Sequence, residues 1–287
     1  MIWLILAVLG LSAGSFISAV VWRVRQQELR AEGREPRAKK TTNYQLPTTN
    51  YSVLHGRSVC PHCRHELAPS DLIPLFSWLL LRGHCRYCGQ PISWQYPAIE
   101  LATAAVFLIS YAFWPGGVYG IGDWVFLIAW LATSVGLMAL LIYDLKWMLL
   151  PNKVLYPTLF VAVAGRLIYL ISFEPDKAQA AVAWALSVAV ASGLFWLIFV
   201  ASAGKWIGYG DVRLGLITGT ILTDPLLSLL MIFVASVLGT LVALPALATG
   251  RKRFGSHIPY GPFLILATGV VLLFGQTPID WYRRLLE

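Results

Sequence analysis

The sequence contains few charged residues. Of its 287 residues, 13% are charged and 57% are hydrophobic, with a mean hydropathy of +0.67. Soluble domains carry about 25% charged residues, so 22 bases and 14 acids are too few to cover a water-facing surface of this size. This scarcity argues against an ordinary soluble enzyme, and the hydrophobicity excludes a disordered chain. The composition predicts a polytopic membrane protein with one polar insertion.

The first apolar run also lacks a basic residue before it, and its bases follow it. A cleaved signal peptide has the opposite arrangement, so we expect a retained helix. Residues 23–95 hold 11 of the 22 Lys and Arg residues. Because short cytoplasmic loops are enriched in Lys and Arg, residues 23–97 are predicted to be cytoplasmic and both termini periplasmic.

Apolar runs recur along the rest of the chain. A helix needs about 20 apolar residues to cross a bilayer. We therefore expect an all-α membrane protein of about eight transmembrane helices, of which the piece at 212–223 is short and is expected to be tilted or partly buried. The predicted spans lie near residues 2–22, 98–114, 123–143, 154–173, 178–200, 212–223, 226–248 and 259–275. The predicted parts are a first helix (1–22), a cytoplasmic loop (23–97) and a membrane core of about seven helices (98–287).

All four cysteines lie in the cytoplasmic loop. They form two pairs, Cys60 with Cys63 and Cys85 with Cys88, separated by 21 residues. Two Cys-x-x-Cys turns supply the four thiolates of a tetrahedral zinc site, and a closed site of this kind is structural. The alternative, two disulfides, is disfavoured in a reducing cytosol.

A basic loop that holds zinc also raises the alternative of nucleic-acid binding. The loop lacks a recognition helix and any interleaving of aromatic and basic residues, and nucleic-acid-binding zinc modules carry such features. We therefore expect anionic lipid at its surface, and no nucleic-acid partner.

Ionisable residues at membrane depth are expensive and indicate function by default. Asp144 ends one apolar run, and Asp211 follows Gly208-Tyr209-Gly210. Both are predicted at the cytoplasmic boundary, at the ends of different helices. Two carboxylates that meet there could share one proton, so that one activates water and the other polarises a peptide carbonyl. Gly208 and Gly210 lack Cβ and would let a substrate backbone approach closely.

Each ionisable residue also has a simpler interpretation. Asp211 could cap a helix, and Asp144 could pair with Lys146. Glu100 could be a supporting acid or a structural partner. Arg166 could pair with an acid that the sequence does not identify.

Together these residues and their neighbours resemble the type IV prepilin leader peptidase family, over nearly the whole chain. The matching blocks are Gly14-Ser15-Phe16, Arg57 to Cys63, Asp71 to Leu79, Gly83 to Gly89, Tyr96 to Glu100, Asp144 with Leu150-Pro151-Asn152, Gly208 to Asp211, and Ile258 to Phe263. Each block alone is modest evidence for the resemblance, whereas all of them in this order, on eight apolar spans, are specific evidence for it.

The resemblance implies an enzyme of the bacterial inner membrane with its active site facing the cytoplasm. It implies that Asp144 and Asp211 are the catalytic aspartates of a Gly-x-Gly-Asp protease, which cleaves the basic leader of type IV prepilins or type II secretion pseudopilins between Gly and usually Phe. It further implies N-methylation from S-adenosylmethionine, and zinc at Cys60, Cys63, Cys85 and Cys88. The sequence shows no glycine-rich nucleotide fingerprint that would locate the methyl donor.

Two other functions remain as alternatives. A presenilin-like intramembrane aspartyl protease shares the Gly-x-Gly-Asp element but lacks the cysteine pairs. A transporter coupled to protons or cations would carry acids near the middle of several spans, whereas Asp144 and Asp211 lie at predicted helix ends.

Overall fold

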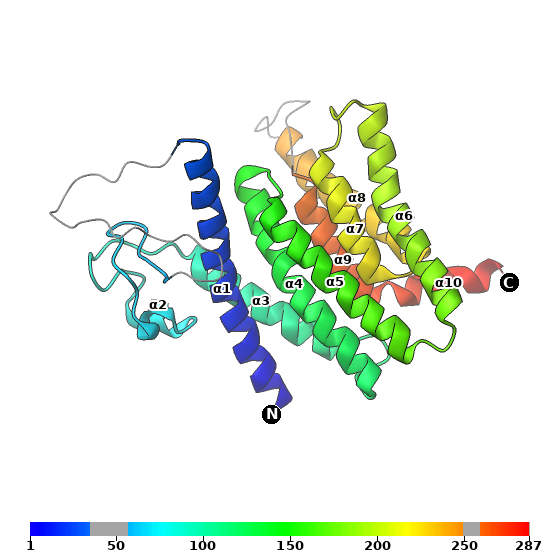
Figure 1. Ribbon diagram of the computed structural model, residues 1–287, viewed down its shortest axis with the longest axis horizontal. Helices are drawn as coiled ribbons and strands as arrows, with labels where there is room; N and C mark the ends of the chain where they lie inside the picture. Colours follow the sequence, from blue (N-terminus) through cyan, green and yellow to red (C-terminus); the bar gives the residue numbers. More distant parts are fainter. Residues whose placement is uncertain (35–56, 249–258, 287) are drawn as a thin grey trace. The chain divides into compact units, whose positions relative to one another are not determined.

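The computed structural model describes residues 1–34, 57–248 and 259–286, and these ranges are predominantly helical, as predicted (Figure 1). The helices are α1 (Ile2–Ala31), the short 3-10 helix η1 (Pro69–Leu72), α2 (Phe76–Leu80), α3 (Gln95–Ala112), α4 (Ile121–Trp147), α5 (Asn152–Phe173), α6 (Lys177–Ala201), α7 (Tyr209–Leu222), α8 (Pro225–Ala248), α9 (Gly261–Phe274) and α10 (Gln276–Leu286).

Within the described ranges, five helices are long and apolar enough to cross a membrane: α1, α4, α5, α6 and α8. The number rises to six if α9 and α10, which are bent by 63° at their junction, form one span. The sequence predicted about eight. Two helices that were predicted as spans but do not meet this criterion are α3 and α7. The 14 residues of α7 extend only about 21 Å, less than the roughly 30 Å of a hydrocarbon core.

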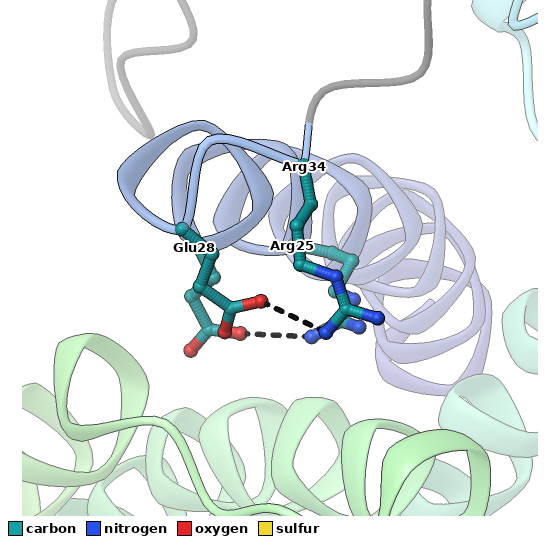
Figure 2. A network of polar contacts seen from close by, with 4 residues as sticks. Arg25, Glu28 and Arg34 are labelled. Carbon is teal, nitrogen blue, oxygen red and sulfur yellow. Dashed lines mark hydrogen bonds and ion pairs between the residues drawn. The ribbon is translucent and has the colours of Figure 1, made fainter.

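The first helix continues well beyond the predicted end near residue 22, to Ala31. This extension is polar, and an ion pair supports it. Figure 2 shows Arg25, Glu28 and Arg34 at this end of α1. Arg25 pairs with Glu28 at 3.5 Å, and opposite charges three residues apart stabilise a helix, which accounts for part of the continuation past the apolar segment. Arg34 lies beyond the end of the helix and pairs with Glu32 at 3.5 Å.

The chain divides into two compact units, residues 1–108 and 109–287. In the first unit, α1 and the start of α3 pack backbone against backbone. A Cβ on Gly10 would lie 2.5 Å from the Cα of Ala104, and a Cβ on Gly14 would lie 2.5 Å from the Cα of Glu100. Small residues allow this close approach in membrane proteins, so two glycines of α1 fix where α3 packs.

In the second unit, α7 lies among other helices, and most of its residues are buried. Its Gly215 packs against α6, where an added Cβ would lie 2.5 Å from the carbonyl oxygen of Ala191. The hydroxyl of Ser192 on α6 donates a hydrogen bond of 2.8 Å to the carbonyl oxygen of Val212. Such interhelical hydrogen bonds hold helices together in a membrane, where the lipid is as apolar as the side chains and no hydrophobic force drives helices to associate. The expectation of a short, partly buried helix at 212–223 is confirmed.

Candidate active site and metal centre

In the second unit, the side chains of Asp144 and Asp211 lie against the same residue, Gly261. A Cβ built on Gly261 would lie 2.5 Å from Oδ2 of Asp144 and 3.6 Å from Oδ1 of Asp211. The two oxygens are therefore no farther apart than the sum of these distances, about 6 Å, a range in which charges influence one another's protonation. Three helix ends meet here: the last turn of α4, the first turn of α7 and the first residue of α9.

Asp144 lies one turn before the end of α4. The helix ends because Met148 adopts a left-handed conformation, with φ 53°, and its amide donates to the carbonyl oxygen of Asp144 at 2.8 Å. Asp144 is only 5% exposed. The alternative in which Asp144 pairs with Lys146 is wrong: Lys146 lies over the ring of Trp147 at 5.4 Å, and no ion pair joins the two residues in the part of the chain that the structure describes.

Asp211 lies in the first turn of α7, three residues after the N-cap position. Gly208 occupies that position, so Asp211 is not the N-cap residue, and the amide of Asp211 donates to the carbonyl oxygen of Gly208 at 3.1 Å. Gly210 has a packing reason that the sequence did not reveal, since a Cβ there would lie 2.9 Å from Cδ1 of Leu150. The approach of a substrate to Gly208 and Gly210 stays a prediction.

The start of α7 is also tied to the start of α5. Arg213 donates a hydrogen bond to the side chain of Asn152, and its guanidinium lies 5.1 Å from the ring centroid of Tyr209. With the contact between Gly210 and Leu150, these interactions hold the helix start that carries Asp211 against the turn before α5.

In the first unit, the four cysteines converge as predicted. The Sγ atoms of Cys60, Cys63, Cys85 and Cys88 all lie within 4.8 Å of one another, and none forms a disulfide. Tetrahedral zinc with Zn–S bonds of about 2.3 Å separates its sulfurs by about 3.8 Å. The four thiols therefore fit a metal ion of this kind after a small contraction.

The two cysteine turns are built alike. In the first, the amide of Arg64 donates to the carbonyl oxygen of Cys60; in the second, the amide of Gly89 donates to that of Cys85. Both residues have positive φ, 58° for Arg64 and 67° for Gly89. An antiparallel bridge then closes each turn, Val59 with Glu66 and His84 with Pro91. Each pair thus forms a rigid knuckle with two thiols on one turn.

Asp71 links the second knuckle to η1, a role that the sequence interpretation missed. Its carboxylate accepts a hydrogen bond of 2.9 Å from the hydroxyl of Tyr87 and pairs with Nε of Arg86 at 2.8 Å. The hydrogen bond to Asp71 raises the pKa of Tyr87. The sequence did not indicate this contact, because Asp71 and Tyr87 are 16 residues apart in the chain.

The other two membrane-depth residues now have partners. Oε2 of Glu100 accepts a hydrogen bond of 2.8 Å from the amide of Leu75, whose φ is 59°. Arg166 forms an ion pair of 2.9 Å with Glu174 and is 5% exposed. Glu100 therefore holds a strained turn, and Glu174 is the acid that the sequence could not identify.

Two known protein families match this chain, one in its N-terminal part and one in the part that contains Asp144 and Asp211. The profile of the bacterial peptidase A24 N-terminal domain matches residues 8–114, and that of the type IV leader peptidase family matches residues 131–244. No solved structure matches the chain.

Among characterised proteins, three similar relatives are each named prepilin leader peptidase/N-methyltransferase. The protein of Aeromonas hydrophila is 31% identical over 95% of this chain and 91% of its own length. That of Pseudomonas aeruginosa is 32% identical, with 93% and 89% covered. That of Burkholderia pseudomallei strain K96243 is 33% identical, with 93% and 84% covered.

Proposed function

We propose a function from the premise that this chain belongs to the type IV leader peptidase family. The protein cleaves the basic leader from type IV prepilins or type II secretion pseudopilins and methylates the new N-terminus. The observation that carries the peptidase assignment is the approach of Asp144 and Asp211 to a common neighbour, Gly261.

Cleavage uses the two carboxylates as a pair that shares one proton. The ionised carboxylate takes a proton from water while the protonated one donates a hydrogen bond to the scissile carbonyl. The water oxygen bonds to the carbonyl carbon, and the C–N bond then breaks as the nitrogen receives a proton. Burial of Asp144 supports this arrangement, because like charges in a poorly solvated site favour a shared proton.

Placement in the bacterial inner membrane follows from the substrate. A prepilin has an apolar helix in the bilayer and a basic leader in the cytosol, so we place the dyad at the cytoplasmic face. We propose about eight spans, α1 and α3 to α9, in which the short α7 is buried among its neighbours and does not by itself reach across the hydrocarbon core. Both termini are periplasmic, and the loop of residues 23–97 is cytoplasmic. Arg23 and the other bases near this loop then lie on the side that the positive-inside rule requires.

Zinc is assigned a structural role at Cys60, Cys63, Cys85 and Cys88. The four thiolates would hold the ion in a closed site, where it would stabilise the loop. S-adenosylmethionine, when bound, would supply the methyl group of its sulfonium to the new N-terminal amine.

The dyad is tested with purified Asp144→Asn and Asp211→Asn proteins and a prepilin substrate. Each substitution is expected to lower kcat by at least about 1,000-fold, because residues that act as a unit each abolish most of its rate enhancement. Asp176→Asn is the matched control, since Asp176 caps α6 and Asn caps equally well. If either dyad variant cleaves prepilin as fast as this control, the assignment is wrong.

A further inference from the structure

An apolar run in the loop between α1 and α3 is exposed in the structure. Residues 72–81 contain no charged side chain, and Ser77 carries their only hydroxyl group. Five of their large hydrophobic side chains are exposed, from 40% for Leu72 to 81% for Leu80. An apolar run of this length typically forms either a buried core helix or an element at a membrane surface. The exposure of these side chains excludes the buried core helix.

We propose that residues 72–80, here called the apolar wedge, insert into the lipid bilayer and contact phospholipid acyl chains. The insertion depends only on α1 crossing the membrane. That the wedge enters the cytoplasmic leaflet rests on the topology of the proposed function. The wedge then anchors the two cysteine knuckles to the bilayer, which goes beyond the expectation of anionic lipid at the surface of this loop.

The depth of the wedge follows from its connection to α1. The Cα of Glu100 lies against Gly14 of α1, where an added Cβ would lie 2.5 Å from it. Gly14 lies ten residues, or about 15 Å along the helix axis, before Val24, near which the apolar part of α1 ends. Oε2 of Glu100 accepts a hydrogen bond of 2.8 Å from the amide of Leu75. One glutamate side chain therefore ties the wedge to a level of α1 that lies within the hydrocarbon core.

The two sides of α2 differ as expected for a helix that faces lipid. Ser77 and Trp78 line a cavity between α2 and α1, and Nε1 of Trp78 donates a hydrogen bond of 3.2 Å to a backbone carbonyl (Figure 1). The other side carries Phe76, Leu79 and Leu80, which are 62–81% exposed. The polar groups thus point inward and the exposed side is entirely apolar, whereas a helix on a water-facing surface has the reverse pattern.

Backbone amides at the entrance to α2 have acceptors within the protein. An unpaired amide is costly in hydrocarbon, so irregular backbone there must be satisfied internally. The amide of Leu75, which precedes α2 and has φ 59°, donates to Glu100. The amide of Ser77 donates to the carbonyl oxygen of Ile73 at 3.1 Å. The buried carboxylate of Glu100 therefore supplies the acceptor that this turn needs within the bilayer.

Polar and aromatic side chains mark the limits of the wedge. Asp71 precedes it and pairs with Arg86 at 2.8 Å, while Arg82 follows it and is exposed. Trp94, directly before α3, is 73% exposed. Arginine side chains extend toward lipid phosphates, and Trp is enriched where a bilayer meets water. These residues suit the headgroup region on either side of an inserted apolar segment.

The test compares collisions of a nitroxide with oxygen, which dissolves in hydrocarbon, and with a nickel chelate, which stays in water. The zinc-loaded, full-length protein is placed in nanodiscs of phosphatidylethanolamine and phosphatidylglycerol. The nitroxide is attached to an encoded p-acetylphenylalanine, which leaves the cysteines unlabelled. It replaces Leu80 in the test protein, Leu4 of α1 in the lipid reference and Glu66 of the first knuckle in the matched control, and all three positions are exposed.

We expect the ratio of oxygen to nickel collisions at Leu80 to be at least about tenfold that at Glu66, and similar to that at Leu4, because polar solutes are strongly excluded from hydrocarbon. Zinc content and leader cleavage show that each labelled protein is folded. A second measurement needs no substitution. Wild-type protein is irradiated with a phospholipid that carries a diazirine on its acyl chain, and the label is expected on the fragment with Phe76 to Leu80 and not on the fragment around Glu66.

The outcomes separate this inference from the proposed function. A collision ratio at Leu80 equal to that at Glu66 would place the wedge in water and overturn the inference. Protection from both oxygen and nickel, without an acyl-chain label, would show that another part of this chain or a second copy covers the wedge, which overturns it as well. An inserted wedge in a wild-type protein that does not cleave prepilin supports the inference and overturns the proposed function. Cleavage by a wild-type protein whose wedge takes no acyl-chain label overturns the inference alone.

Discussion

Replacing Gly261 by alanine should abolish most leader cleavage while leaving the protein folded. The new Cβ would lie 2.5 Å from Oδ2 of Asp144, whereas ordinary contacts of a Cβ begin at 3.4 Å. The carboxylate must therefore move by about 1 Å, and a misplacement of that size in a catalytic group costs about 100-fold in rate. This loss corresponds to about 2.7 kcal/mol of transition-state stabilisation.

The assay follows the cleavage of a purified prepilin by mass spectrometry and separates kcat from KM. Gly193→Ala is the matched control, because Gly193 lies within α6 and nothing lies within 4 Å of its added Cβ. We expect kcat to fall about 100-fold for Gly261→Ala and to stay within about threefold of wild type for Gly193→Ala. Zinc content should be normal in both. A Gly261→Ala protein with wild-type kcat would show that the dyad is not held against this glycine, and the geometric argument would be refuted.

Three further predictions concern stability. Cys63→Ser should lose the bound zinc and lower Tm by at least about 10 °C; metal analysis that still finds one zinc per chain would contradict the four-cysteine site. Gly89→Ala should cost about 1 kcal/mol, because its φ is 67° and nothing lies within 4 Å of the added Cβ, so the cost is conformational; an unchanged Tm would refute this. Glu174→Gln should cost about 2 kcal/mol by leaving the buried Arg166 unpaired, whereas Glu32→Gln in an exposed pair should cost less than about 0.5 kcal/mol; equal Tm values for the two would contradict the burial argument.

The helices were largely predictable, because long apolar runs leave few alternatives to helices in a bilayer. The number of helices that cross the membrane was harder to predict. Hydropathy does not distinguish a helix that faces lipid from one that other helices surround, and α7 is of the second kind. The extension of α1 to Ala31 also escaped prediction, because apolarity ends near Val24 while the polar residues after it continue the helix, with an ion pair between Arg25 and Glu28.

The cluster of four cysteines was predictable to the residue, because two thiols on one turn impose their own spacing. The two aspartates were predictable as candidates, because an acid at the end of an apolar run is costly and stands out. The partner of Glu100 did not stand out, because Glu100 meets the amide of Leu75 and a backbone amide leaves no mark in a sequence.

Gly261 shows most clearly what the sequence could not reveal. It is the first residue of an apolar helix, where a glycine needs no special explanation, and it lies 117 and 50 residues from Asp144 and Asp211 in the chain. Only the meeting of three helix ends gives it a role, since any side chain there would occupy the space of the Asp144 carboxylate. The same holds for Gly210 beside Leu150. In a site formed where helices end, the acids are visible because of their charge, whereas the glycines that make room for them become visible only once the helices are packed.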